Sequence, residues 1–201
     1  MIKYKYILGI FFACLLLTLC IYPYLPTRMA VHWNENGGAN EFMSKQVVVL
    51  FIPVLIIILH GLVYVILHNI YKFNEGEYFI INGFIKSITL FMMFVHILIL
   101  FINLGSIISF QTGLTIGISM FLFMFSRVFK KVKDREKEPI KLQKIRLVSR
   151  RIFQVMACGI LFSLLLSLKW GFYLLISVIS CGSILFMFYI LYAYILESYE
   201  T

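Results

Sequence analysis

Charged residues are scarce in this sequence, and acidic residues are the scarcest of them. Only 13% of the 201 residues are charged, against 62% that are hydrophobic, whereas soluble domains carry about 25% charged residues. A soluble fold of this length leaves a large share of its surface in water, so it could not cover this much apolar surface. The composition therefore excludes an ordinary soluble domain and predicts an integral membrane protein.

Cysteine and recognised catalytic motifs are also lacking. The four cysteines lie inside apolar runs, without the spacing of a metal site or a disulfide framework. The sequence has no His-Glu-x-x-His motif, nucleophile elbow or phosphate-binding loop. No long apolar run contains an acidic residue, although proton-coupled transporters and intramembrane acid proteases commonly need one. We therefore expect a protein that is not an enzyme and has neither a cofactor nor a metal.

Long apolar runs are what the sequence does contain. A membrane-spanning helix needs about 20 apolar residues, and sufficient runs cover residues 6–24, 46–71, 78–129 and 152–196. The third run is too long for one span at about 1.5 Å per residue, and it is interrupted by Gly105-Ser106 and Gln111-Thr112-Gly113. The fourth run is interrupted at Lys169-Trp170-Gly171. The sequence thus predicts an all-α bundle of about six transmembrane helices.

Basic residues are concentrated in one segment, which sets the expected orientation. Residues 127–151 contain eleven basic and three acidic side chains, so they carry +8 of the net charge of +9. Positive charge marks cytoplasmic loops. This segment and both termini are therefore expected in the cytoplasm, and residues 25–45 outside.

The same segment shows helical periodicity. Ile145, Val148 and Ile152 recur at helical spacing between basic residues, which predicts an amphipathic helix on the inner leaflet that then turns into the fifth span. We expect the basic side chains to contact anionic lipid or a cytoplasmic regulator. These candidates are Lys130, Lys131, Lys133, Lys141, Lys144, Arg146, Arg150 and Arg151. Nucleic acid is not an expected partner, because the orientation rule already explains the charge.

The ionisable side chains of His60, His96 and Lys86 fall within the predicted spans, where such groups are functional candidates. Helix rise places His60 about 21 Å and His96 about 12 Å from the outer face. That offset is too large for a shared metal, whose bonds are about 2 Å long. Each histidine is therefore expected to be neutral and hydrogen-bonded within the bundle, and Lys86 to extend toward the inner interface. Gly113 and Gly117 predict a close helix contact.

The outside loop, residues 25–45, carries the most informative residues. Leu25-Pro26 ends the first span, and Asn36-Gly37-Gly38 predicts a tight turn. A loop held between two helices commonly carries function. The candidates for contact with a ligand or partner are His32, Trp33, Asn34, Gly37, Asn40 and Lys45.

This loop resembles the N-terminal domain of bacterial SdpI-type membrane proteins, a domain of unknown function. The matching positions are Leu25, Pro26, His32, Trp33, Asn34, Gly37, Ser44 and Lys45, without gaps. Family members often carry proline where this chain has Ala30 and aspartate where it has Asn40. The Arg-Thr-Pro-Trp segment that SdpI-type immunity proteins usually have is absent. The resemblance therefore covers residues 5–70 closely and the remainder in helix layout.

The resemblance implies a multi-pass protein of the bacterial cell membrane that confers immunity to, or senses, a secreted toxin peptide. The outside loop would bind the peptide, and the basic segment would contact a regulator. A small transporter or transporter subunit and a metal-dependent membrane enzyme using His32 remain alternatives. The expected organisation is an N-terminal module (1–75), helices three and four (76–129), a basic loop (130–151) and helices five and six (152–201). Ligand identity and oligomeric state stay open, a homo-oligomer included.

Overall fold

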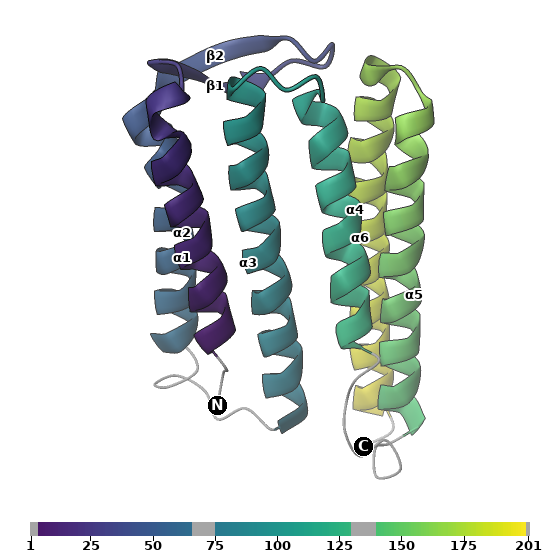
Figure 1. The fold of residues 1–201 in the computed structure, drawn as a ribbon. Helices are drawn as coiled ribbons and strands as arrows, with labels where there is room; N and C mark the ends of the chain where they lie inside the picture. Colours follow the sequence, from purple (N-terminus) through teal and green to yellow (C-terminus); the bar gives the residue numbers. More distant parts are fainter. Residues whose placement is uncertain (1–3, 66–74, 130–139, 200–201) are drawn as a thin grey trace.

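The computed structural model describes residues 4–65, 75–129 and 140–199, and it has six α-helices in those ranges (Figure 1). They are α1 (Tyr4–Ile21), α2 (Lys45–Val65), α3 (Glu75–Asn103), α4 (Phe110–Val128), α5 (Ile140–Phe162) and α6 (Leu168–Tyr199). Two single-turn 3₁₀ helices, η1 (Tyr22–Tyr24) and η4 (Ser163–Leu165), follow α1 and α5. The predicted all-α bundle is confirmed. Four helices among the described residues are long and apolar enough to cross a membrane: α2, α3, α5 and α6.

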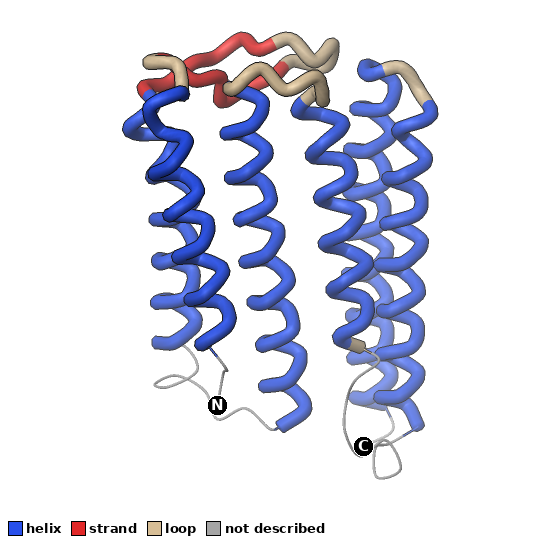
Figure 2. Tube along the Cα trace, in the orientation of Figure 1, coloured by secondary structure: helices blue, strands red, loops and turns tan. Residues whose placement is uncertain are grey.

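The helices run side by side, and a two-stranded sheet lies across one end of the bundle (Figure 2). Strand β1 (Arg28–Trp33) pairs antiparallel with β2 (Ala39–Ser44). We call this the hairpin end. Helix α1 begins and α6 ends at the opposite end (Figure 1). The sequence analysis predicted the turn between the strands but not the strands themselves. All of β2 is exposed, so its sequence does not alternate between apolar and polar residues as that of a half-buried strand does.

Two hydrophobic clusters hold the described part of the bundle. One joins α4, α5 and α6 through Leu122, Phe153, Met156, Ala157, Ile160 and Leu175. The other lies under the hairpin and consists of Leu25, Met29, Val48, Val49 and Leu100. Met29, the β1 member of the second cluster, is fully buried. The hairpin is therefore attached to the membrane helices by a core of its own.

Glycines bring α3 and α4 together between these two clusters. A Cβ atom at Gly113 would lie 2.4 Å from a Leu98 methyl group, and one at Gly117 would lie 2.4 Å from the Phe94 ring. Both distances are far below normal van der Waals contact. The predicted close contact at this glycine pair is confirmed.

The predicted break at Gly105-Ser106 is confirmed, because α3 ends at Asn103 and α4 begins at Phe110. The breaks predicted at Gln111-Thr112-Gly113 and at Lys169-Trp170-Gly171 need correction. Gln111-Thr112-Gly113 lies in the first turn of α4, because the Ser109 side chain accepts a hydrogen bond from the Thr112 amide and starts the helix earlier. Lys169-Trp170-Gly171 lies in the first turn of α6. The carbonyl of Ser167 already accepts a helical hydrogen bond from the Gly171 amide at 2.8 Å. The actual break therefore precedes Leu168.

The predicted surface helix before the fifth span is wrong. Helix α5 is one continuous helix over Ile140–Phe162, with no turn between its basic and apolar parts. Packing explains why the basic part continues the helix without a turn. Ser149 is buried, and the Tyr189 hydroxyl of α6 donates to the Lys144 carbonyl at 3.4 Å. Lys144 and Arg151 are exposed and Arg146 and Arg150 half-buried on this helix. The backbone of Lys141 belongs to α5 as well, and Lys130, Lys131 and Lys133 lie outside the described residues.

Candidate functional site

Asn34 and Gly37 build the turn of the hairpin. The Asn34 side-chain oxygen accepts hydrogen bonds from the amides of Asn36 (3.1 Å) and Gly38 (2.9 Å). The backbone closes the turn, since the Gly37 amide donates to the Asn34 carbonyl and the Asn34 amide donates to the Gly38 carbonyl. Gly37 has φ of +81°, which favours glycine. These two candidate residues therefore shape the turn.

His32 and Asn40 form an exposed pair across the strands. The register is irregular here, since His32 pairs with Glu41 while the next residue, Trp33, pairs with Ala39. His32 Nδ1 donates to Asn40 Oδ1 at 2.5 Å. Both side chains are exposed. Among the described residues, no group of three His, Cys, Asp or Glu side chains is arranged to hold a metal.

The far end of the hairpin contacts α4 and α6. The Trp33 ring stacks on that of Phe110, with ring centroids 4.0 Å apart and planes 11° apart. A Cβ atom on Gly37 would lie 3.1 Å from a Leu168 methyl group. The hairpin, which belongs to the first half of the chain, therefore reaches two helices of the second half (Figure 1).

Asn103, at the end of α3, is the residue that the sequence analysis missed. Its Oδ1 accepts from the Ala30 amide at 2.7 Å, and its Nδ2 donates to the Ala30 carbonyl at 3.1 Å. The side chain thus occupies the outer edge of β1 as a third strand would. An asparagine near a helix end is unremarkable in the sequence, and nothing there signals a bond to a residue 73 positions away.

Lys45 closes the loop at the other side. Its ammonium group donates to the Tyr22 carbonyl at 3.3 Å and lies 4.4 Å from the centre of the Tyr22 ring. A cation at a helix C-terminus satisfies free carbonyls and complements the helix dipole. Lys45 is therefore a structural cap for the end of η1, which leaves His32 and Asn40 as the exposed polar pair among the candidates.

The two membrane histidines each hydrogen-bond to a threonine on another helix. The Thr18 hydroxyl donates its proton to the Cys14 carbonyl at 2.8 Å, so at 2.9 Å it accepts from His96 Nε2. His60 Nε2 likewise donates to Thr89, whose hydroxyl donates to the Ile85 carbonyl. The prediction of separate, hydrogen-bonded histidines is confirmed.

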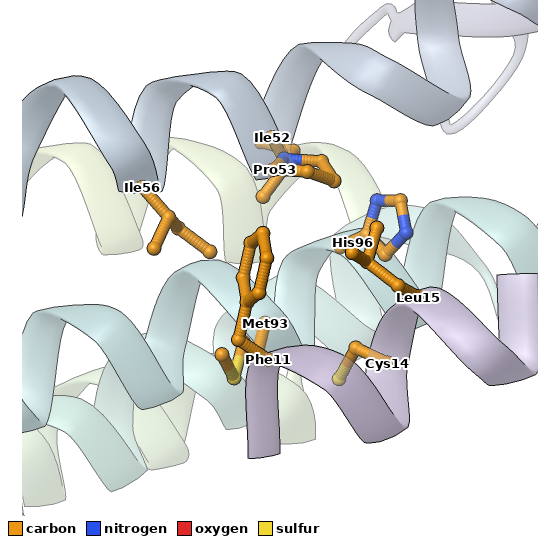
Figure 3. Close-up of a pocket in the computed structure, with 8 residues that line it drawn as sticks. All are labelled: Phe11, Cys14, Leu15, Ile52, Pro53, Ile56, Met93 and His96. Carbon is orange, nitrogen blue, oxygen red and sulfur yellow. The ribbon is translucent and has the colours of Figure 1, made fainter. Parts of the chain in front are cut away.

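His96 also borders a small gap between α1, α2 and α3 (Figure 3). Apolar side chains such as Phe11, Ile56 and Met93 line the rest of it. The gap holds about 10 Å³, which is close to the minimum for one water molecule. It is therefore a packing defect too small for a ligand. Lys86, which like His96 lies on α3, is half-buried and is not among the residues that line this gap.

We expect the His96–Thr18 bond to show measurable coupling in a double-mutant cycle of His96→Leu and Thr18→Val. Such bonds in membrane bundles contribute about 0.6 kcal/mol on average and about 1.7 kcal/mol at most. The measurement is reversible unfolding in mixed micelles. His60→Leu combined with Thr18→Val is the control, and equal coupling in both cycles would contradict the assigned bond.

The fold and this site define a helical membrane protein whose hairpin is fixed across one end of the bundle by α3, α4 and α6. A family model for a domain of unknown function, DUF1648, matches residues 9–57. The match covers most of α1, the hairpin and the first part of α2. Comparisons with curated proteins and with solved structures gave no match.

Proposed function

We propose that this protein is a non-enzymatic protein of the bacterial cell membrane that binds a secreted peptide at its hairpin end. The peptide would be a toxin to which the protein confers immunity, or a signal that it senses. The SdpI-type sequence pattern of the loop supports this function. The observation that carries it is the open edge of β2 on a hairpin that several helices hold in place.

The geometry of the strands favours peptide binding at β2. Both backbone groups of Ala30 bond to Asn103, so Ala30 and its partner Phe42 form a pair without mutual hydrogen bonds. The Phe42 backbone then faces the outer edge of β2, where its carbonyl accepts an exposed hydrogen bond from the Arg28 guanidinium at 3.2 Å that a bound peptide would replace. Within the described residues the sheet has two strands. An extended peptide can extend such a sheet by pairing with its free edge.

Exposed apolar side chains next to this edge would add affinity. Phe42 and Met43 on β2 are 47% and 51% exposed. Exposed apolar side chains at a binding surface supply most of its affinity. A hydrophobic peptide fits this surface better than a highly charged one.

The charge distribution supports an outward-facing hairpin. Arg127 in the last turn of α4 and Lys144 near the start of α5 are exposed, and these helix ends lie at the end of the bundle opposite the hairpin. Under the positive-inside rule that end faces the cytoplasm. There the basic side chains would attract anionic lipid or contact a cytoplasmic regulator.

We expect cells that express this protein to survive a secreted toxin peptide better than cells without it, and Phe42→Ala to lose much of that protection. Truncation of a central apolar contact commonly costs more than 1 kcal/mol, or about fivefold in affinity. The measurement is survival of a sensitive bacterium against a panel of secreted peptides. Leu191→Ala, at a residue that is 48% exposed on α6, is the control.

Two outcomes would reject this function. Unchanged survival across a broad panel would remove the immunity and sensing hypothesis. Equal loss of protection in both variants would show that β2 is not the contact surface.

A further inference from the structure

Arg28, the first residue of β1, places a positive charge at the open edge of β2. Its partner in the strand register is Ser44, so Phe42 is its diagonal neighbour on the same face of the sheet. The guanidinium group crosses β2 and donates to the Phe42 carbonyl at 3.2 Å. Because this carbonyl points away from β1, the guanidinium lies at the outer side of the sheet.

The charge of Arg28 is not balanced by an acidic side chain of the described residues. The side chain is exposed, and the bond to the Phe42 carbonyl is the interaction that its guanidinium makes within the described ranges. Glu41 precedes Phe42 on β2, so its side chain leaves the opposite face of the strand. Glu35 lies in the turn beyond the other end of β1, a strand length of about 17 Å away. The guanidinium can therefore accept an anionic partner.

A peptide strand paired with β2 would bring its own groups to this charge. Its backbone amide would replace the guanidinium on the Phe42 carbonyl and leave the guanidinium beside the new strand. Neighbouring strands are about 4.8 Å apart, so a carboxylate on the same face of the peptide would come within ion-pair distance of Arg28. A carboxylate can accept two parallel hydrogen bonds from a guanidinium group and also neutralise its charge, which a water molecule cannot do.

We propose that Arg28 determines which peptides bind at the hairpin end, by pairing with a carboxylate of an otherwise apolar, extended peptide. The carboxylate is an Asp or Glu side chain or the C-terminus of the peptide. This inference rests on the proposed peptide-binding function and adds the charge by which the ligand is recognised. Phe42 contacts the apolar part of the peptide, and a peptide whose charges are all positive is repelled.

The test selects peptides on the full-length protein in lipid nanodiscs, after the libraries have been depleted on empty nanodiscs. Two bacteriophage libraries display random decapeptides, one with free C-termini and one with C-termini blocked by fusion. The parent protein is compared with Arg28→Glu and with Lys169→Glu. Lys169 is exposed in the first turn of α6, at the hairpin end, so the control makes the same change of charge at that end.

We expect the parent protein and Lys169→Glu to enrich apolar peptides that carry a carboxylate, and Arg28→Glu to enrich peptides with Lys or Arg instead. Acidic residues enriched in the blocked library would identify a side-chain carboxylate. Enrichment confined to the library with free C-termini would identify the terminal carboxylate. The selected peptide should bind the parent protein about fivefold more tightly than its amide counterpart (Asn, Gln or an amidated C-terminus), the effect of one exposed ion pair.

Two results would separate this inference from the function on which it rests. Peptides that lose binding to Phe42→Ala but show no preference for a carboxylate, or the same preference on Arg28→Glu, would overturn the role of Arg28 and leave peptide binding intact. No enrichment over empty nanodiscs would overturn both. The comparison of acid and amide peptides uses the parent protein, so it stays decisive if Arg28→Glu does not fold.

Discussion

Replacing Asn103 with leucine is expected to release the hairpin from the bundle. The substitution removes the partner of the amide and of the carbonyl of Ala30. Leaving such groups unpaired costs about 1–3 kcal/mol, and 2 kcal/mol corresponds to about a thirtyfold change in a local opening equilibrium. The Ala30 amide should therefore exchange its hydrogen with solvent about thirtyfold faster, as hydrogen exchange with mass spectrometry can measure.

Asn82→Leu is the matched control for this experiment. It is the same substitution on the same helix, at an asparagine whose buried side-chain oxygen has no hydrogen-bond partner among the described residues. Replacing it should leave exchange at Ala30 unchanged. If both variants behaved alike, or if Asn103→Leu left Ala30 protected, the bond between α3 and β1 would not be what fixes the hairpin.

Gly117→Leu is expected to separate α3 from α4. The new side chain would overlap the Phe94 ring, which lies 2.4 Å from the position of its first carbon atom. Overpacking of this kind typically costs 1–3 kcal/mol. The expected result is a lower unfolding temperature in detergent and a longer distance between spin labels on α3 and α4.

Gly61→Leu on α2 separates this steric effect from the loss of glycine itself. No atom of the described residues lies within 4 Å of a Cβ atom at Gly61, and the residue is exposed. This variant should be as stable as the parent protein, because an exposed leucine suits lipid. A similar loss of stability in both variants would show that close packing at Gly117 does not join the two helices.

The helical bundle could be predicted from the sequence because lipid imposes a simple rule on it. Every backbone group in the apolar layer needs an internal partner, which leaves helices as the form for long apolar runs. Helix rise then separated His60 and His96 in depth, and the structure gives each histidine a hydrogen bond of its own. Helix ends were less predictable, since the side chain of Ser109 and the carbonyl of Ser167 decided where α4 and α6 begin.

The candidate site was predictable only where its contacts are local. Asn34 and Gly37 belong to one turn, and short-range turn preferences located it. The bonds from Ala30 to Asn103 and the stacking of Trp33 on Phe110 join segments far apart in the chain. No local pattern encodes such pairs.

The attachments of the hairpin limit how far its segment can be transplanted. Residues 9–57 match a family model by themselves, yet the strand they contain is bonded to Asn103 and rests against Phe110. Grafted onto a foreign pair of helices, this segment would keep its turn and lose its anchors. A working chimera would need to carry those two side chains with it, or supply equivalents from its new host.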